Sequence, residues 1–427
     1  MMAASQSSTF TAIFAVALVC TLLIRLWLAQ RQIRHVQAHR AEVPPEFAQR
    51  IDLASHQKAA DYTVARTRLG MVETIVDTVV LAILTFGGVL AWLVEITGGI
   101  DAGVLWQDLA LIVGIALVTG VIGLPFAYWH TFVLEAQFGF NRTTLKLWLT
   151  DLVKGIALGA VLGLPLAALA LTLMRVAGDY WWLWVWAVWI GFQFLILALY
   201  PTVIAPLFNK FSPLPDGPAR ARVEALLARC GFKSRGLFVM DGSKRSSHGN
   251  AFFTGFGRAK RIVFFDTLLQ RLAPEEVEAV LAHELGHFRL KHVIKRMLWM
   301  ALASLLLLAL LAWLMRSPWF YGGLFVPPSM DRPGVALVLF FMVLPVFTFL
   351  LAPLSALYSR KHEFEADAFA ARYASASELV HALVKLYQDN AATLTPDPVH
   401  STFYDSHPPA AIRIARLQNL AAQSSGG

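Results

Sequence analysis

Residues 274–287 of this chain read PEEVEAVLAHELGH. Pro274 followed by Glu275 and Glu276 is typical of the first turn of a helix. The segment ends in the pattern H-E-x-x-H, in which His283 and His287 are four residues apart. On a helix two such residues lie about 40° apart around the axis, so both imidazoles can reach one metal ion.

Zinc is the ion that this pattern favours. It binds histidine nitrogens at about 2.0–2.1 Å and leaves a position open for water. Glu284 directly follows the first ligand, so its carboxylate can take a proton from that water, whose pKa zinc lowers towards about 7. The pattern therefore predicts a hydrolytic metal site. The alternative is an amphipathic helix with two solvated histidines, which leaves the further candidate ligands unexplained.

The composition is that of a membrane protein with several spans. Of the 427 residues, 57% are hydrophobic and 15% are charged, and the mean hydropathy is +0.58. A net charge of +8 would also suit nucleic-acid binding, but in a membrane protein such an excess more often reflects Lys and Arg in cytoplasmic loops. We therefore expect the lipid bilayer, and no nucleic acid, as a partner. The two cysteines, Cys20 and Cys230, predict no disulfide framework.

Seven stretches are long and apolar enough to cross about 30 Å of hydrocarbon. The first lacks a basic segment before its apolar run, so we interpret it as a retained anchor and not as a signal peptide. Tryptophans crowd the start of the fifth, as in an interfacial belt. The predicted spans are 10–29, 75–94, 109–129, 155–174, 180–206, 297–315 and 334–358.

The charges of the loops predict the orientation. Residues 30–70 and 207–296 are rich in Lys and Arg, whereas the short loop after the second span is acidic. We therefore expect the N-terminus outside and both catalytic segments in the cytoplasm, at the inner (plasma) membrane if the host is a bacterium. The predicted parts are 1–206 with five spans, 207–296 as a catalytic insert, 297–358 with two further spans, and 359–427 as a C-terminal catalytic segment.

The insert should hold a small sheet. Residues 236–240 and 261–265 predict strands, and residues 246–253 predict an edge strand. Edge strands beside zinc clefts bind extended peptides through main-chain hydrogen bonds, although an ordinary hairpin is an equal alternative. A helix is predicted over 218–230. The motif helix is expected to continue through Lys291 and His292 into the sixth span. His292 lies five residues past His287, so we expect it to point elsewhere and to be a solvated interfacial residue instead of a ligand.

A third metal ligand is expected after the last span, where residues 359–367 read SRKHEFEAD. Positions 363 and 367 share one helix face. Spacing alone leaves His362, Glu363 and Glu365 as candidate ligands, and a charged helix face outside the membrane is the alternative interpretation.

Beyond single motifs, the chain resembles the integral-membrane CAAX prenyl endopeptidases, zinc metalloproteases that trim isoprenylated proteins. The sequence block after the last span is more specific for this family than H-E-x-x-H, and the order of all the matching blocks along the chain is more specific still. The matching blocks are F-G-F-N at 138–141, P-L-F-N-K-F at 206–211, S-S-H-G-N-A-F at 246–252, H-E-L-G-H at 283–287, E-F-E-A-D-A-F-A at 363–370 and S-H-P-P at 406–409.

The resemblance implies roles for individual residues. Glu363 would be the third zinc ligand, and Asp367 would support the ligand shell. Asn250 would hold substrate backbone in the cleft. His407 would lie near the zinc and stabilise the developing oxyanion or orient the substrate.

The resemblance also aligns Arg413 with a family arginine near the site, where it would meet a substrate carboxylate. This chain departs from the family at the preceding position, which is Ile412 instead of the usual acid.

The expected fold is an α-helical polytopic membrane protein: seven transmembrane helices with a gluzincin-like α+β zinc protease domain on the cytoplasmic side. The family further implies a water-filled chamber between the spans. Polar groups at membrane depth usually face an interior, but those at span ends meet lipid headgroups. The groups concerned are Glu73, Asp77, Asp151, Lys154 and Gln193.

Three functions are compatible with these residues. The first is a membrane zinc endopeptidase of the CAAX prenyl protease type, acting on peptide or protein substrates that include isoprenylated ones. The second is a quality-control metalloprotease of the heat-shock type, but these are shorter and have fewer spans. The third is a transporter or assembly factor stabilised by zinc, in which Glu284 would have no purpose.

Overall fold

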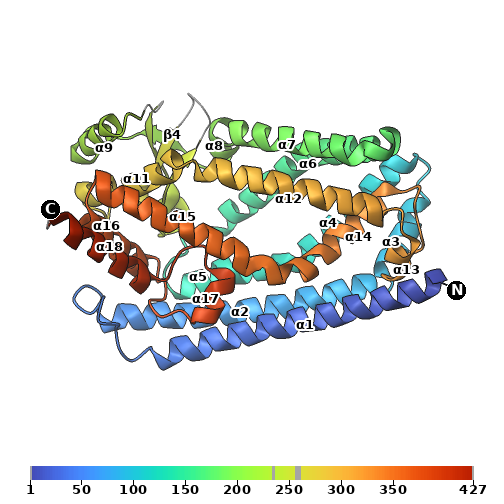
Figure 1. Ribbon diagram of the computed structural model, residues 1–427, viewed down its shortest axis with the longest axis horizontal. Coiled ribbons are helices and arrows are strands. Elements are labelled where there is room, and N and C mark those ends of the chain that lie inside the picture. The colour runs from blue at the N-terminus through green and yellow to red at the C-terminus, as the bar shows by residue number, and fades with distance from the viewer. Residues whose placement is uncertain (1, 233–235, 255–260, 426–427) are drawn as a thin grey trace.

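The computed structural model describes residues 2–232, 236–254 and 261–425. Long helices run along the molecule, and the elements that carry the H-E-x-x-H motif and the C-terminus gather at one end (Figure 1). The N-terminus lies at the opposite end, so helix α1 (Met2–Ala38) runs along the long axis towards the catalytic elements.

In the part of the chain that the structure describes, seven apolar spans agree with the sequence prediction, when the bent pair counts as one span. Six are single stretches, and the seventh is a bent pair, α2 and α3, whose axes meet at 54°. The bend falls at Gly88, whose φ of +74° favours glycine. The membrane helices are α1, α2 (Leu53–Thr85), α3 (Val89–Gly98), α4 (Val104–Tyr128), η1 (Trp129–Leu134), α5 (Glu135–Gln137), α6 (Leu145–Val176), α7 (Trp181–Leu199), η3 (Tyr200–Ile204), α8 (Ala205–Phe208), α12 (His292–Leu314), α14 (Pro333–Thr348), η6 (Phe349–Leu351) and α15 (Ala352–Tyr373). Two short helices, η2 (Gly178–Tyr180) and α13 (Pro318–Gly322), complete the connections between spans.

A buried ion pair joins the spans at the end remote from the motif. Arg332, just before α14, donates from Nε to Asp108 of α4 at 3.1 Å and from Nη1 to the carbonyl of Val94 in α3 at 2.7 Å. Gly334 N donates to the second oxygen of Asp108 at 2.8 Å. Charged groups between membrane helices need such partners because hydrocarbon provides none. The pair therefore fixes α3, α4 and α14 together.

The sheet of the insert has the strand order β1-β2-β4-β3. Strands β1 (Phe211–Pro213) and β2 (Leu237–Met240) are antiparallel, β2 and β4 (Arg261–Phe265) are parallel, and β3 (Ala251–Thr254) is antiparallel to β4. The predicted edge strand is therefore present as β3, but it is shorter than residues 246–253. Residues 246–250 form an irregular segment with an isolated bridge from Ser246 to Asn141.

One apolar core combines the insert with the C-terminal segment. Phe264 of β4 and Leu281 of α11 belong to the same buried cluster as Leu383 and Ile414. Segments separated by two membrane spans thus form a single catalytic unit. Its helices are α9 (Pro218–Arg229), α10 (Asp266–Leu269), α11 (Pro274–Arg289), α16 (Ala376–Asp389), α17 (Pro398–Tyr404) and α18 (Ala410–Ser425), with the short turn η4 (Gly242–Lys244) beside the sheet.

Polar contacts attach this unit to the membrane helices. Arg245 donates from Nε to Asp151 of α6 at 2.8 Å and from Nη1 to Asn209 at 2.8 Å. Lys154, one turn further along α6, donates to the carbonyl of Leu207 at 2.8 Å. Asp151 and Lys154, expected as interior or headgroup-facing residues, thus hold the insert against α6.

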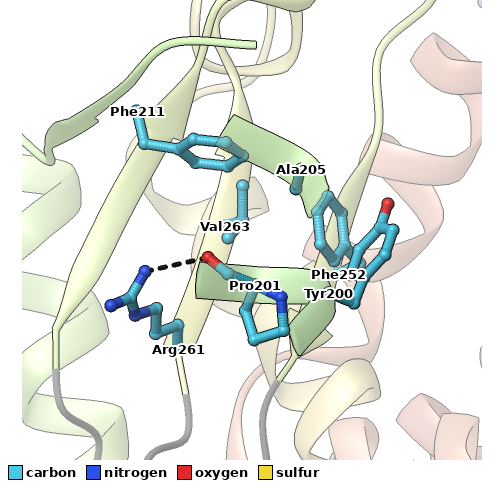
Figure 2. Close-up of a pocket in the computed structure, with 7 residues that line it drawn as sticks. All are labelled: Tyr200, Pro201, Ala205, Phe211, Phe252, Arg261 and Val263. Atoms are coloured by element: carbon cyan, nitrogen blue, oxygen red, sulfur yellow. Dashed lines mark hydrogen bonds between the residues drawn. The ribbon is translucent and has the colours of Figure 1, made fainter. Parts of the chain in front are cut away.

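A small pocket lies where the sheet meets the end of α7. Arg261 donates from Nη1 to the carbonyl of Pro201 at 3.0 Å and closes one side of it (Figure 2). Its lining is mostly apolar and includes no histidine, cysteine or acid, so the pocket is a small gap in the packing of these elements and not a metal site. The lining residues are Tyr200, Pro201, Ala205, Phe211, Phe252, Arg261 and Val263.

Candidate metal centre

The motif helix α11 begins as the sequence predicts. Pro274 is its first residue, and Glu276 Oε2 accepts a hydrogen bond from the backbone N–H of Ala273 at 2.7 Å. This contact satisfies a donor that a helix N-terminus leaves free. The helix ends at Arg289, and Lys291 has a φ of +58°. The prediction of one continuous helix into the sixth span is therefore wrong, because a left-handed residue separates α11 from α12.

Three predicted ligands meet between α11 and α15. The Nε2 atoms of His283 and His287 are 3.2 Å apart. Glu363 Oε2 lies 3.5 Å from His283 Nε2, and Glu363 Oε1 lies 3.3 Å from His287 Nε2. His283 and Glu363 are buried, whereas His287 is half-buried.

These separations fit a divalent metal ion. Tetrahedral zinc with bonds of about 2.0–2.1 Å separates its ligand atoms by about 3.3–3.4 Å. The three distances of 3.2, 3.3 and 3.5 Å span that value. Glu363 Oε2 is also buried without a hydrogen-bond partner. The nearby cation Arg413 approaches it only to 3.7 Å from Nη2, so a metal ion would supply the direct contact that a buried carboxylate needs. The residues present therefore fit a zinc ion.

A buried acid and base support the first histidine. Asp367 Oδ1 lies 2.9 Å from His283 Nδ1, so the ring can donate there and keep Nε2 free for a metal. Arg413 donates to the same carboxylate from Nε at 2.7 Å and from Nη2 at 2.8 Å. Burial opposes the charge on Arg413, but the hydrogen bonds and charge of Asp367 outweigh it and raise the pKa of the guanidinium. Both residues are almost completely buried.

We expect Arg413→Ala to destabilise the protein by about 3–5 kcal/mol, because Asp367 would then be a buried charge without its cation. Arg416→Ala, on the same helix α18 but exposed, is the matched control and should have little effect. Thermal unfolding in detergent measures both. Equal stability of the two variants would show that the buried pair does not hold the site together.

Glu284 is half-buried and lies between the two histidines on α11. Burial raises the pKa of its carboxyl and the charge of Glu363 acts in the same direction, while His283 and His287 oppose the shift. A raised pKa makes the carboxylate a stronger base, which suits proton transfer near neutral pH.

His407 also reaches the cluster. Its Nε2 lies 3.5 Å from Glu363 Oε2, and its Nδ1 lies 3.0 Å from Ser406 Oγ, while the side chain stays largely exposed. Asn250 is exposed at the start of the edge strand β3, and within the described residues no hydrogen bond links it to the cluster. Ile412 is 56% exposed, so the position at which the chain departs from the family pattern points away from Asp367.

The structure corrects the expectation for His292. This residue is 4% exposed, and its Nδ1 lies 3.0 Å from Nδ1 of His287. It is therefore not solvated and does not point away. The helix break at Lys291 turns His292 back towards the motif, and sequence reasoning missed it because the argument assumed an unbroken helix.

Gly286, within the motif, permits the close contact of α11 with α15. A Cβ atom at this position would lie 2.9 Å from Ala366 Cα and 3.0 Å from Phe369 Cβ. Neither neighbour is the flexible end of a side chain, so the two helices would have to separate. The ligands are divided between these helices, so their spacing depends on this contact.

We expect Gly286→Ala to cost about 1–3 kcal/mol of stability through overpacking and to weaken metal binding. Gly159→Ala, in helix α6 with open space around the new methyl group, is the control and should not reduce either. Zinc content after dialysis and thermal unfolding are the measurements. Unchanged metal content in Gly286→Ala would contradict the argument that helix contact sets ligand spacing.

The fold and the site together define a class of protein. A membrane protein with seven apolar spans that brings H-E-x-x-H against an acid from a second helix is a membrane metallopeptidase. Two family matches cover nearly the whole chain: CAAX prenyl protease N-terminal, five membrane helices, at residues 32–210, and peptidase family M48 at residues 213–421. The chain belongs to the M48 family of membrane metalloproteases, in its CAAX prenyl protease 1 group.

Individual relatives agree with this assignment. CAAX prenyl protease 1 homologs of Oryza sativa and Homo sapiens are 33% and 31% identical, covering 90% and 96% of this chain and 93% and 96% of the relatives. CAAX prenyl protease 1 of Saccharomyces cerevisiae is 36% identical over 73% of this chain and 72% of its own length. The crystal structure of S. mikatae Ste24p matches with a TM-score of 0.89 at 29% identity, covering 96% of this chain and 99% of that one. The alternative of a transporter or assembly factor does not agree with these findings.

Proposed function

We propose that the chain is a zinc endopeptidase that holds one zinc ion through His283, His287 and Glu363. The observation that supports this most strongly is the spacing of 3.2 to 3.5 Å between the two imidazole nitrogens and the carboxylate oxygens of Glu363, together with the lack of a hydrogen bond to the buried Oε2 of Glu363. When bound, zinc supplies a Lewis acid that polarises the scissile carbonyl and acidifies water.

Residues of the chain then transfer the proton, stabilise the oxyanion and position the ligands. Glu284 accepts a proton from the attacking water on its carboxylate and passes that proton to the nitrogen of the departing amine. His407 donates from Nε2 to the oxyanion that develops on the substrate, a contact of a kind that contributes a few kcal/mol. Asp367 orients His283, and Arg413 holds Asp367 in place.

The substrate binds in extended form along β3 in this proposal. Two features favour the edge of β3: among the described strands it is the last of the sheet, with no partner on its outer side, and Asn250 is exposed just before its start. Asn250 would bind substrate backbone there. Arg413 has two donors engaged by Asp367, so a substrate carboxylate would meet it only through its remaining N–H groups.

We propose peptides and proteins with a prenylated CAAX end, together with other membrane-associated polypeptides, as substrates. The names of the relatives supply the prenyl class. A water-filled chamber between the spans would admit them. In four of the spans only 6–11% of the most apolar stretch is buried, which suits helices arranged around an open interior better than a packed bundle.

The proposed orientation places the N-terminus outside and the catalytic unit in the cytoplasm. It rests on the Lys and Arg residues of positions 30–70, the segment in which the chain turns from α1 into α2 at the catalytic end (Figure 1). We retain the division into 1–206, 207–296, 297–358 and 359–427, in which the second and fourth parts form the catalytic unit. An N-terminal tag should be cleaved by protease added to intact cells, and a C-terminal tag should be protected.

The purified protein in detergent tests the function directly. It is incubated with a farnesylated CAAX peptide and with the same peptide without the lipid, each with and without a chelator. We expect cleavage of the farnesylated peptide that stops on chelation and returns with zinc. Equal cleavage of both peptides would favour general proteolysis of the quality-control kind, and cleavage that survives complete zinc removal would contradict the proposal.

A further inference from the structure

His292 occupies a place that the helix break creates. Lys291, with its left-handed backbone, ends α11, and His292 is the first residue of α12. A non-glycine residue in this conformation is uncommon and is maintained only when its surroundings fix it. The consequence is that the His292 ring lies against His287, with ring centroids 5.1 Å apart at an interplanar angle of 75°.

A chain of hydrogen bonds passes from His287 through His292 to an acid. The Nδ1 atoms of His287 and His292 are 3.0 Å apart, and Nε2 of His292 lies 2.9 Å from Glu365 Oε2. A carboxylate only accepts, so His292 must donate from Nε2. Its Nδ1 is then the acceptor, and His287 must donate from Nδ1. The Nε2 lone pair of His287 is thereby left free and directed at His283 and Glu363.

We propose that His292 and Glu365 are positioning residues that fix the tautomer and ring orientation of His287. This inference rests on the proposed role of His287 as a zinc ligand. The arrangement gives each histidine of the motif its own support: Asp367 contacts Nδ1 of His283 directly, and Glu365 acts on Nδ1 of His287 through His292. Both acids lie on α15 beside Glu363, so one helix provides the third ligand and both supports.

The same residues do not form a second metal site. His292, His362 and Glu365 are close enough together to be considered as one. However, the rings of His292 and His362 are stacked, with centroids 4.0 Å apart and only 11° between their planes. A metal ion must lie in the plane of each imidazole that binds it, and two parallel planes share no such point. His362 therefore supports the His292 ring by stacking. Both nitrogens of His292 remain for the hydrogen bonds to His287 and Glu365, and we call these three hydrogen-bonded residues the relay.

Three substitutions of His292 separate the parts of this relay. His292→Phe keeps the ring and the stack on His362 but removes both hydrogen bonds. His292→Asn keeps an acceptor near the Nδ1 position. His292→Gln places its amide one bond further out, where it reaches Glu365 but not His287. His39→Phe, at an exposed position just after α1, is the matched control, and His287→Ala tests the metal site itself.

The measurements are the zinc dissociation constant, from competition with a chelator, and kcat and KM for peptide cleavage. We expect His292→Phe and His292→Gln to weaken zinc binding by about 10–100-fold, as is usual for loss of a supporting group. Their kcat should fall while KM stays unchanged, because His292 does not touch substrate. His292→Asn should retain most of the wild-type zinc affinity and kcat, and His39→Phe should match the wild type.

Each other outcome would overturn the relay. If His292→Phe binds zinc as tightly as the wild type while His287→Ala loses its zinc, the proposed metal site stands and the relay is refuted. Equal losses in all three His292 variants would make His292 a packing residue only. A second equivalent of zinc in the wild type that disappears in His292→Phe would make it a metal ligand. Retention of zinc by His287→Ala would contradict the proposed metal site itself.

Discussion

Replacing Glu284 by glutamine is expected to lower peptide cleavage by about 10²–10⁴-fold, the usual contribution of a general base. Glutamine has nearly the same size as glutamate but cannot accept the proton of the attacking water. The three donor atoms belong to other residues, so the variant should keep its zinc. Burial raises the pKa of Glu284, and the neutral amide should be accommodated at this position without loss of stability.

The experiment compares zinc content and cleavage of a farnesylated CAAX peptide in the wild type and in Glu284→Gln. Glu224→Gln, a surface substitution on α9, is the control and should behave as the wild type. Full activity in Glu284→Gln would remove this residue from the mechanism. Loss of zinc together with activity would instead make it part of the metal site.

Replacing Glu363 by glutamine is expected to remove the zinc. The carboxylate is 7% exposed and one of its oxygens has no hydrogen-bond partner, so its charge is present for a cation. Glutamine keeps the shape but removes the charge and offers a much weaker ligand. The loss of affinity should exceed the about 10–100-fold that follows removal of a supporting group, and cleavage should be lost with it.

His362→Gln provides the comparison for this variant, because the residues around position 363 left His362 open as a ligand from spacing alone. The ring of His362 is stacked on His292 and does not reach the three donor atoms. His362→Gln should therefore keep its zinc, with at most the about 10–100-fold weaker binding that follows loss of a supporting group. Retention of zinc by Glu363→Gln together with complete loss in His362→Gln would reverse the assignment.

Much of the fold could be predicted from the sequence because the membrane imposes it. Hydrocarbon admits only helices of a minimum length, so all seven spans could be located from apolar runs. What could not be predicted is how α2 and α3 bend at Gly88 or that α14 continues through η6 and α15 into the catalytic unit. Those features depend on contacts between spans, and the positions of apolar residues along the sequence do not predict such contacts.

The candidate site was predictable where its residues share one helix. The pair His283 and His287 follows from helix periodicity, and the start of α11 follows from Pro274 and Glu276. Spacing alone left three candidates for the third ligand because Glu363 comes from a helix 76 positions away from His287, and only tertiary contact of α11 with α15 selects it. Gly286, a small residue on α11 at that contact, is the one feature of the motif that could have indicated the close approach of a second helix.

His292 shows most clearly where prediction from periodicity fails. Five residues after His287 on an ideal helix, it would face away, and the break at Lys291 reverses that expectation. Lysine gives no sign of a left-handed conformation, which favours glycine or asparagine. The break exists because α11 packs in the catalytic unit while α12 must enter the membrane, and this is a property of the whole fold.

The most direct test of the account is diffraction from crystals of the wild-type protein, with data collected on both sides of the zinc absorption edge. The account predicts one anomalous peak per chain, about 2.0–2.2 Å from Nε2 of His283, Nε2 of His287 and a carboxylate oxygen of Glu363. An anomalous peak away from these atoms, or a zinc ion bound by the two histidines with Glu363 beyond bonding distance, would contradict it.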